Sequence, residues 1–383
     1  MRHRDSSISP RAVRFQALGV LRESFPWASP VRAVSVDQLL RVLLLAATTC
    51  GSIHSIVSSL FSFGLHGIYR AFLANCHSTE ATTHALNQAL HTLLARSRLD
   101  RTQPCLLALD SHFVPYYGDR VRTPGLMGGQ RKAGTKFFHG YATAILLRKR
   151  RRYTVALLPL SPGEKPHELM RRLLDTVAAF GLTVGGVTAD SGFDSAETLL
   201  LLQERKLAYA IPLRRKGRGS NPRNDLFNHR CDTVHWATWK SEKSRRRVTT
   251  AVYVWRRKNS KRGMVVAFSG WTAGAARDRI TRAAGRRARD TYRCRFGIET
   301  SYRQKNEGRG MTTSRNPVWR LWLEGIAHLL RQVWVLLTEQ IAVHRNLTDD
   351  AWISDLPLRK LLLWLEQILR ESQEIPLGTI PCD

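Results

Sequence analysis

The chain has 383 residues and a mass of 43.5 kDa, enough for two or three domains of ordinary size. Hydrophobic residues make up 43% and charged residues 23%, which excludes a wholly disordered or fibrous protein. Lys and Arg number 60 against 30 Asp and Glu, so the formal net charge is +30. A chain this basic predicts a polyanionic partner, and nucleic acid is the leading candidate.

Cysteine usage and hydropathy limit the class of protein further. Six cysteines are scattered without a Cys-x-x-Cys pair, which argues against a zinc ribbon or a dense disulfide framework. The N-terminal segment lacks the apolar core of a signal peptide. The long apolar segment 318–343 is interrupted by Arg320, Glu324, His328 and Arg331, so it is a poor membrane span. We therefore expect a cytoplasmic, nucleoid-associated protein.

Residues 1–100 have a helical pattern. Ser35 is placed to cap a helix that continues to Ala47, and two short helices are expected between Ile53 and Phe72. Ser78 precedes another helix, in which Ala and Leu recur at helical spacing. We predict a helical DNA-binding domain, although the sequence pattern does not assign any of its segments as a recognition helix.

From residue 104 the pattern changes to alternating strands and helices. A short apolar strand from Cys105 ends in a carboxylate, Asp110, and a later strand from Val184 ends in another, Asp190. Between and after them we expect strands at 141–147, 153–159 and 207–213 and helices at 168–180 and 195–206. This order predicts an α/β core over residues 104–213 that begins with antiparallel strands.

Residues 214–272 break this pattern and predict a β-rich insertion, with strands at 248–255 and 264–269. Its tryptophans are expected to form the core of the insertion, with stacking on unpaired bases as the alternative: Trp236, Trp239, Trp255 and Trp271. Helices are expected from residue 273 onward, with the rest of the core at 273–345 and a helical tail at 346–383. Three further tryptophans at helical spacing predict core packing: Trp319, Trp322 and Trp334.

Glu299 is a third candidate acidic residue, in addition to the two carboxylates at strand ends. Over a predicted helix spanning 290–306, helical spacing puts five side chains on one stripe: Tyr292, Arg295, Glu299, Arg303 and Asn306. Three convergent carboxylates suit a pair of hard divalent cations, which take oxygen ligands. Each Asp taken alone is more typical of a turn or a helix cap, so the metal-site prediction depends on the three carboxylates together.

These residues resemble a known family. The segments LALDSHF, GVTADSGFD and YRCRFGIETSYRQ are similar to those of the DDE transposases of bacterial and archaeal insertion sequences, in the IS-four-like branch with its Tyr-x2-Arg-x3-Glu signature. The resemblance covers residues 104–335 and implies an α/β, ribonuclease-H-like catalytic core interrupted by the β-rich insertion. It implies that Asp110, Asp190 and Glu299 hold two Mg²⁺ or Mn²⁺ ions.

The resemblance also implies a reaction and its partners. Water hydrolyses a phosphodiester at the element end, and the freed 3′-hydroxyl then joins target DNA. Tyr292 and Arg295 are expected to contact DNA. The family often has a Lys at the position of Asn306, and Arg303 is expected to substitute for that Lys in contacting DNA. The partners would be terminal inverted repeats and target double-stranded DNA, bound by a homodimer. A metal-dependent nuclease or resolvase that does not join strands, and an inactive DNA-binding relic, remain alternatives.

Three polar features have local interpretations. His112 shares a strand face with Asp110, but a single His is more often engaged in local hydrogen bonding. Asp194 is expected to cap the following helix. The basic turn Arg148–Arg152 suits either a solvated hairpin tip or a phosphate clamp.

Overall fold

The computed structural model describes residues 9–25, 27–28, 32, 34–61, 64–75, 77–148, 150–217, 221–241, 245–256, 263–270, 280–348, 353 and 355–371. Trp271 and the tail beyond Glu371 lie outside these residues. Within them, the N-terminal third is helical, as predicted: α1 (Pro10–Ser24), α2 (Val36–Thr48), α3 (Ile53–Leu60), α4 (Leu65–Ala74) and α5 (Thr79–Ala95). Ser35 caps α2 in a capping box with Gln38, and Ser78 caps α5.

The remaining helices are distributed through the core and the C-terminal third. They are α6 (Pro166–Ala179), α7 (Ala196–Glu204), the short α8 (Pro222–Asp225), α9 (Arg282–Cys294), α10 (Gly297–Asn306), α11 (Pro317–His344) and α12 (Leu358–Glu371). Two 3₁₀ turns accompany them, η1 (Ser191–Phe193) and η2 (Leu226–Asn228). In α11, Trp319, Trp322 and Trp334 are buried, which confirms the core role predicted for them.

The described strands form one mixed sheet in the order β2-β3-β1-β5-β6-β9-β8-β7, with β4 also paired to β3. Their bounds are β1 (Cys105–Pro115), β2 (Met127–Lys132), β3 (Thr135–Arg148), β4 (Arg151–Pro159), β5 (Val184–Ala189), β6 (Ala208–Pro212), β7 (Thr233–Lys240), β8 (Arg247–Arg256) and β9 (Gly263–Ser269). Parallel pairing of β1, β5 and β6 at the centre gives the predicted α/β core. The sequence did not reveal β2 or β7.

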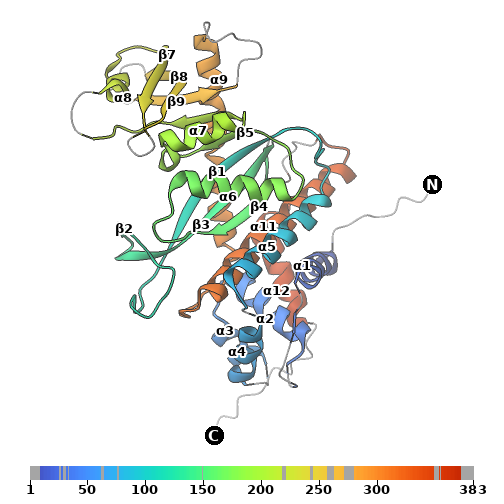
Figure 1. Cartoon of the computed structure of the whole chain (residues 1–383). Helices are drawn as coiled ribbons and strands as arrows, with labels where there is room; N and C mark the ends of the chain where they lie inside the picture. The colour runs from blue at the N-terminus through green and yellow to red at the C-terminus, as the bar shows by residue number, and fades with distance from the viewer. Residues whose placement is uncertain are drawn as a thin grey trace.

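The insertion strands continue the catalytic sheet. β9 pairs antiparallel with β6, and β8 and β7 follow outward from it. Figure 1 shows β7–β9 with α8 and α9 at one end of the molecule and helices α1–α4 with α12 at the other. Of the insertion tryptophans, Trp239 and Trp255 are partly buried against the core, whereas Trp236 is exposed, so the core prediction is wrong for Trp236.

Side chains from two helices cover the free edge of β4. Asn87 of α5 bonds both the amide and the carbonyl of Leu157, and His91 bonds the carbonyl of Val155 at 2.7 Å. From α11, Gln332 accepts the Thr154 amide at 3.0 Å. An uncovered edge strand would offer unpaired backbone groups to other chains. These contacts protect the edge and join the N-terminal helices and α11 to the core.

Candidate functional site

Two of the predicted acidic residues lie side by side at one edge of the sheet. Leu109 of β1 pairs in parallel register with Ala189 of β5, so the next residues, Asp110 and Asp190, are neighbours. The prediction that the first strand ends at Asp110 is wrong. β1 continues to Pro115 because its antiparallel pairing with β3 extends to Pro115 and Phe138, and only the pairing with β5 ends at Leu109.

The third acidic residue comes from a helix that is interrupted. The predicted single helix over 290–306 breaks at Arg295 and Phe296 into α9 and α10, and α10 begins at Gly297, a poor helix former. The single stripe is therefore wrong. Tyr292 is buried, and Arg303 and Asn306 are exposed on α10.

Arg295, in the break between the helices, connects the acidic residues. Its Nη1 lies 3.1 Å from Asp110 Oδ2, and its Nη2 lies 3.8 Å from Glu299 Oε1. The guanidinium also lies 5.5 Å from the centre of the Tyr292 ring, within cation–π range. Tyr292 thus supports Arg295 from inside the protein, and Arg295 brings the Glu299 helix to Asp110.

The pKa of Asp110 reflects its burial and its charged neighbours. Burial raises the pKa of Asp110 to about 6, Arg295 opposes this rise, and the negative charges of Asp190 and Glu299 add to it. Glu299 differs from Asp110 in exposure, since 51% of its side-chain surface is accessible against 10% for Asp110. The edge therefore holds an excess of negative charge that is only partly neutralised by one Arg.

This donor set fits a hard divalent cation, although the side chains do not form a cage. Carboxylate oxygens are the ligands that Mg²⁺ and Mn²⁺ prefer. Among the residues described, no three His, Cys, Asp or Glu side chains are gathered closely enough to hold a metal ion. Arg295 lies against both Asp110 and Glu299, and Asp190 accepts the Gly192 amide at 2.8 Å. The Arg295 guanidinium must move for Asp110 and Glu299 to share a cation with Asp190.

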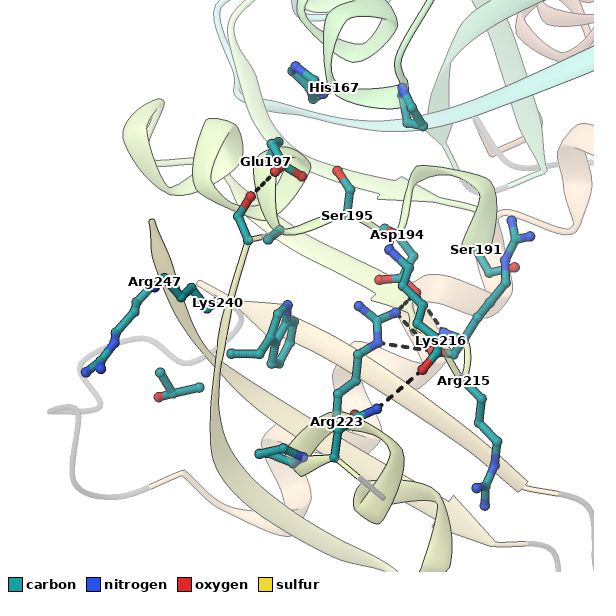
Figure 2. A pocket seen from close by; sticks show the side chains of 18 of the residues that line it. His167, Ser191, Asp194, Ser195, Glu197, Arg215, Lys216, Arg223, Lys240 and Arg247 are labelled. Carbon is teal, nitrogen blue, oxygen red and sulfur yellow. Dashed lines mark hydrogen bonds and ion pairs between the residues drawn. The ribbon is translucent and has the colours of Figure 1, made fainter. Parts of the chain in front are cut away.

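A basic groove adjoins Asp190. A cavity of about 940 Å³ lies between the start of α6, the η1–α7 segment and the insertion, and Ser191 and Gly192 are in its wall. Seven Lys or Arg residues line it: Lys165, Arg214, Arg215, Lys216, Arg223, Lys240 and Arg247. Figure 2 shows Lys240 and Arg247 across the hollow from Arg215 and Lys216.

Both acidic residues of this groove are engaged with other groups. Asp194 forms a buried ion pair with Arg223 and accepts the Arg214 amide at 2.7 Å, and Glu197 accepts a hydrogen bond from Ser241 (Figure 2). The prediction that Asp194 caps the next helix is wrong, because Ser195 is the cap of α7. With its acids paired, the groove is strongly positive overall.

A buried ionic cluster lies behind the acidic edge. Lys305 of α10 forms an ion pair with Glu324 of α11, and His112 Nε2 lies 2.7 Å from Glu324 Oε1 and 3.0 Å from Lys305 Nζ. His328 approaches the same oxygen at 3.4 Å. The positive charge of Lys305 holds the pKa of Glu324 well below its usual range despite burial, and burial lowers the pKa of His112 to about 4.

Sequence reasoning did not identify this cluster. The local interpretation of His112 is wrong, because its partners are about 190 and 210 residues away in the chain. Lys305 is not among the five side chains of the predicted stripe, and its side chain is buried in the interior. The available signal was the set of charged residues in the apolar segment of α11, where Glu324, His328 and Arg331 recur at helical spacing. In the part of the chain that the structure describes, no helix is long and apolar enough to cross a membrane.

Comparison with known proteins accords with this geometry. No curated protein sequence matches the chain. Among solved structures, the chain is similar to the piggyBac transposase in a synaptic complex with hairpin DNA, with a TM-score of 0.60 and 12% sequence identity over 97% of this chain and 82% of that one. Residues 101–318, more than half of the chain, match the family model for the transposase DDE domain. The chain therefore belongs to the DDE transposases, enzymes that depend on a divalent metal ion.

Proposed function

We propose that this transposase cleaves DNA at the ends of an insertion sequence and joins the freed 3′-hydroxyl ends to target DNA. The observation that carries the proposal is the acidic edge. Asp110 of β1 lies one residue beyond the parallel pairing with β5, Asp190 follows β5, and Arg295 links Glu299 to Asp110. The Tyr-x2-Arg-x3-Glu spacing of Tyr292, Arg295 and Glu299 supports assignment to the IS-four-like branch.

Asp110, Asp190 and Glu299 would hold two Mg²⁺ or Mn²⁺ ions. Divalent ions at such a site supply Lewis acidity, which activates an attacking oxygen and stabilises the leaving one. The chain's own contribution begins with Arg295. The guanidinium of Arg295 lies against Asp110, and its planar donors would suit a DNA phosphate if Asp110 held a cation instead. The Tyr292 ring, 5.5 Å from the guanidinium, would keep Arg295 at the edge.

The other predicted phosphate contacts differ in exposure. Lys305, one residue before Asn306, forms a buried ion pair with Glu324, so its side chain is not accessible to DNA. Arg303 is exposed one helical turn after Glu299, so we assign it the phosphate contact that the family often gives to Lys. Tyr292 acts through Arg295, since its own ring is buried.

Three observations support double-stranded DNA as the substrate. The net charge is +30, the basic groove opens beside Asp190, and the piggyBac transposase, with a similar fold, was solved with hairpin DNA. The groove would guide a strand past Asp190 through contacts with its phosphates. Terminal inverted repeats and target DNA would be bound by a homodimer, because two element ends are joined in one event.

The test uses the DNA that flanks the coding region. A labelled end fragment is incubated with the wild type and with Glu299→Gln, in Mg²⁺, in Mn²⁺ and in chelator, and the products are then supplied with target DNA. We expect metal-dependent nicking at the repeat boundary followed by strand joining, both lost in the variant. Nicking without joining would identify a nuclease or resolvase, and specific binding without nicking would identify a DNA-binding relic.

A further inference from the structure

A second, smaller cavity lies on the other side of α10 from the acidic edge. It has a volume of about 110 Å³ and is enclosed by the tip of the β3–β4 hairpin, the first turns of α10 and the middle of α11. Four arginines line it: Arg150, Arg151 and Arg152 from the hairpin and Arg331 from α11. No Asp or Glu is among its lining residues. The basic turn noted in the sequence is thus partly folded inward.

Two of these arginines, Arg151 and Arg331, are buried without a carboxylate acceptor, Arg152 is half-buried, and Arg150 is exposed. Arg331 is 3% exposed and donates to the carbonyl of Arg152 at 3.0 Å and to Gln304 at 3.3 Å, both neutral groups. Arg151 is 7% exposed, and its Nη2 is buried without a hydrogen-bond partner, as is Nε of Arg152. A buried donor without an acceptor costs about 1–3 kcal/mol, and more when it carries a charge. The cavity therefore holds unused hydrogen-bond donors.

The positive charges also act on one another. Burial lowers the pKa of Arg331 to about 9, and the nearby charge of Arg152 lowers it further in the same direction. Two arginines buried elsewhere in this chain have carboxylate partners, Arg295 with Asp110 and Arg223 with Asp194. The helix α10 begins at this cavity with Gly297, and any side chain at that position would overlap the Arg152 guanidinium. The positive end of the helix dipole adds to the field of the arginines.

We propose that this cavity binds one phosphate group, held by Arg151, Arg152 and Arg331 with the Ser301 hydroxyl at its wall. A cavity of about 110 Å³ admits several water molecules, and so a single tetrahedral oxyanion. Guanidinium groups match phosphate oxygens in pairs, which suits a ligand with several acceptors more than a halide ion. The source is either a free phosphate species or a phosphate of the DNA backbone, and the latter rests on the proposed function. Bound phosphate would fasten α10, which carries Glu299, to the hairpin.

The first test measures thermal unfolding of the full chain in inorganic phosphate, against chloride of equal ionic strength. For the wild type we expect the Tm to rise by roughly 2–4 °C at saturating phosphate. Arg151→Gln and Arg331→Gln should lose this rise. Arg148→Gln is the matched control, because it removes the same charge from an exposed position of the same hairpin outside the cavity. An equal rise in all four proteins would mean general surface binding and would overturn the proposal.

A structural role for the arginines predicts a different result. Should the cluster serve only to hold the fold together, Arg151→Gln would lower the Tm without phosphate, and phosphate would still raise it. A phosphate site predicts that Arg151→Gln unfolds at the same or a higher temperature than the wild type without phosphate, because a repulsive charge is gone. Arg151→Gln therefore keeps the test decisive even where Arg331→Gln fails to fold.

A second measurement separates the two sources. Binding of a labelled DNA duplex is titrated for Arg151→Gln and Arg148→Gln, with and without phosphate. A backbone phosphate predicts about tenfold weaker binding by Arg151→Gln than by the control, and displacement of DNA by phosphate beyond the effect of matched chloride. A free phosphate predicts equal DNA binding by the two variants, with the Tm response intact. Both outcomes support the site and leave the Glu299 cleavage test independent.

Discussion

The acidic edge and the buried ionic cluster are built on the same two elements and behave oppositely. β1 contributes Asp110 to the edge and His112 to the cluster, and α10 contributes Glu299 and Lys305. At the edge, three carboxylates interact with one Arg and Glu299 is half exposed. In the cluster, Lys305 and Glu324 are almost completely buried and paired with each other.

The comparison suggests how α10 is held in place while Glu299, a proposed metal ligand, stays adjustable. Separating a buried ion pair leaves an uncompensated charge, so Lys305 and Glu324 favour one position of α10 on α11 and β1. The edge has excess negative charge and solvent access, so its side chains are able to reorganise around a cation. His112, two residues after Asp110, and Lys305, about two helical turns after Glu299, would thus give the two proposed metal ligands a rigid support.

Substitutions at the edge should have the largest effect on activity and little on stability. We expect Asp190→Ala and Glu299→Gln each to reduce strand cleavage by roughly 10³-fold or more, because each would remove a proposed ligand of the metal ions. A nicking assay measures the rate, and fluorescence anisotropy with labelled DNA and a thermal melt serve as controls. Cleavage at the wild-type rate by either variant would remove that residue from the metal site.

Breaking the buried Lys305–Glu324 ion pair should have the opposite effect, which is a large loss of stability. Glu324→Gln leaves Lys305 buried without a counter-charge and should lower the free energy of unfolding at pH 7 by about 3–5 kcal/mol. Because the pKa of Glu324 is held low in the folded state, this contribution is present above pH 4.5 and is lost only in stronger acid. Denaturant unfolding measures the difference. A loss below about 1 kcal/mol would show that the cluster does not fix the helix.

His91 is buried and bonded to a backbone carbonyl, so it tests how burial without an ion pair changes a pKa and the stability. His91 bonds the Val155 carbonyl, and burial lowers its pKa from 6.5 to about 4. Between these values the unfolded chain binds more protons, so stability falls as the pH falls. From pH 7 to pH 5 the wild type should lose about 2 kcal/mol more than His91→Gln, as measured by denaturant unfolding. Parallel pH profiles of the two proteins would contradict this assignment.

The smallest effect is expected at an exposed ion pair. Arg246 Nη2 lies 2.5 Å from Glu204 Oε1, and both side chains are about half exposed. Glu204→Gln makes the same chemical change as Glu324→Gln, yet it should alter the free energy of unfolding by no more than about 0.5 kcal/mol. The same denaturant titration provides the measurement. A cost of several kcal/mol here would show that burial is not what distinguishes the cluster.

Local patterns in the sequence were sufficient for much of the core. Apolar runs located β1, β5 and β6, and N-cap residues located α2 and α5 because those signals act within a few residues. The spacing of Tyr292, Arg295 and Glu299 identified the segment that reaches the edge. The sequence also led to Asp110 and Asp190, which the parallel register makes neighbours.

The features that local patterns missed depend on distant partners. Helical periodicity continues through Arg295, and the break there accompanies a buried ion pair with Asp110, 185 residues earlier. The Lys305–Glu324 pair needs a turn between two helices whose geometry no periodicity specifies. β7 was missed because its alternating pattern includes exposed Trp236 and only partly buried neighbours, which weakens the apolar signal.

Because β6 pairs with β9, the insertion is not a separate module that can be removed from the core. An insertion that formed its own domain would be removable as a cassette, with its two flanking residues rejoined. Here, excision of residues 214–272 would strip β6 of the neighbour that occupies four of its five positions and expose backbone amides and carbonyls beside the catalytic strands. Such an edge recruits other chains. Loop lengths within the insertion are therefore free to vary during evolution or engineering, whereas β9 must be retained with the core.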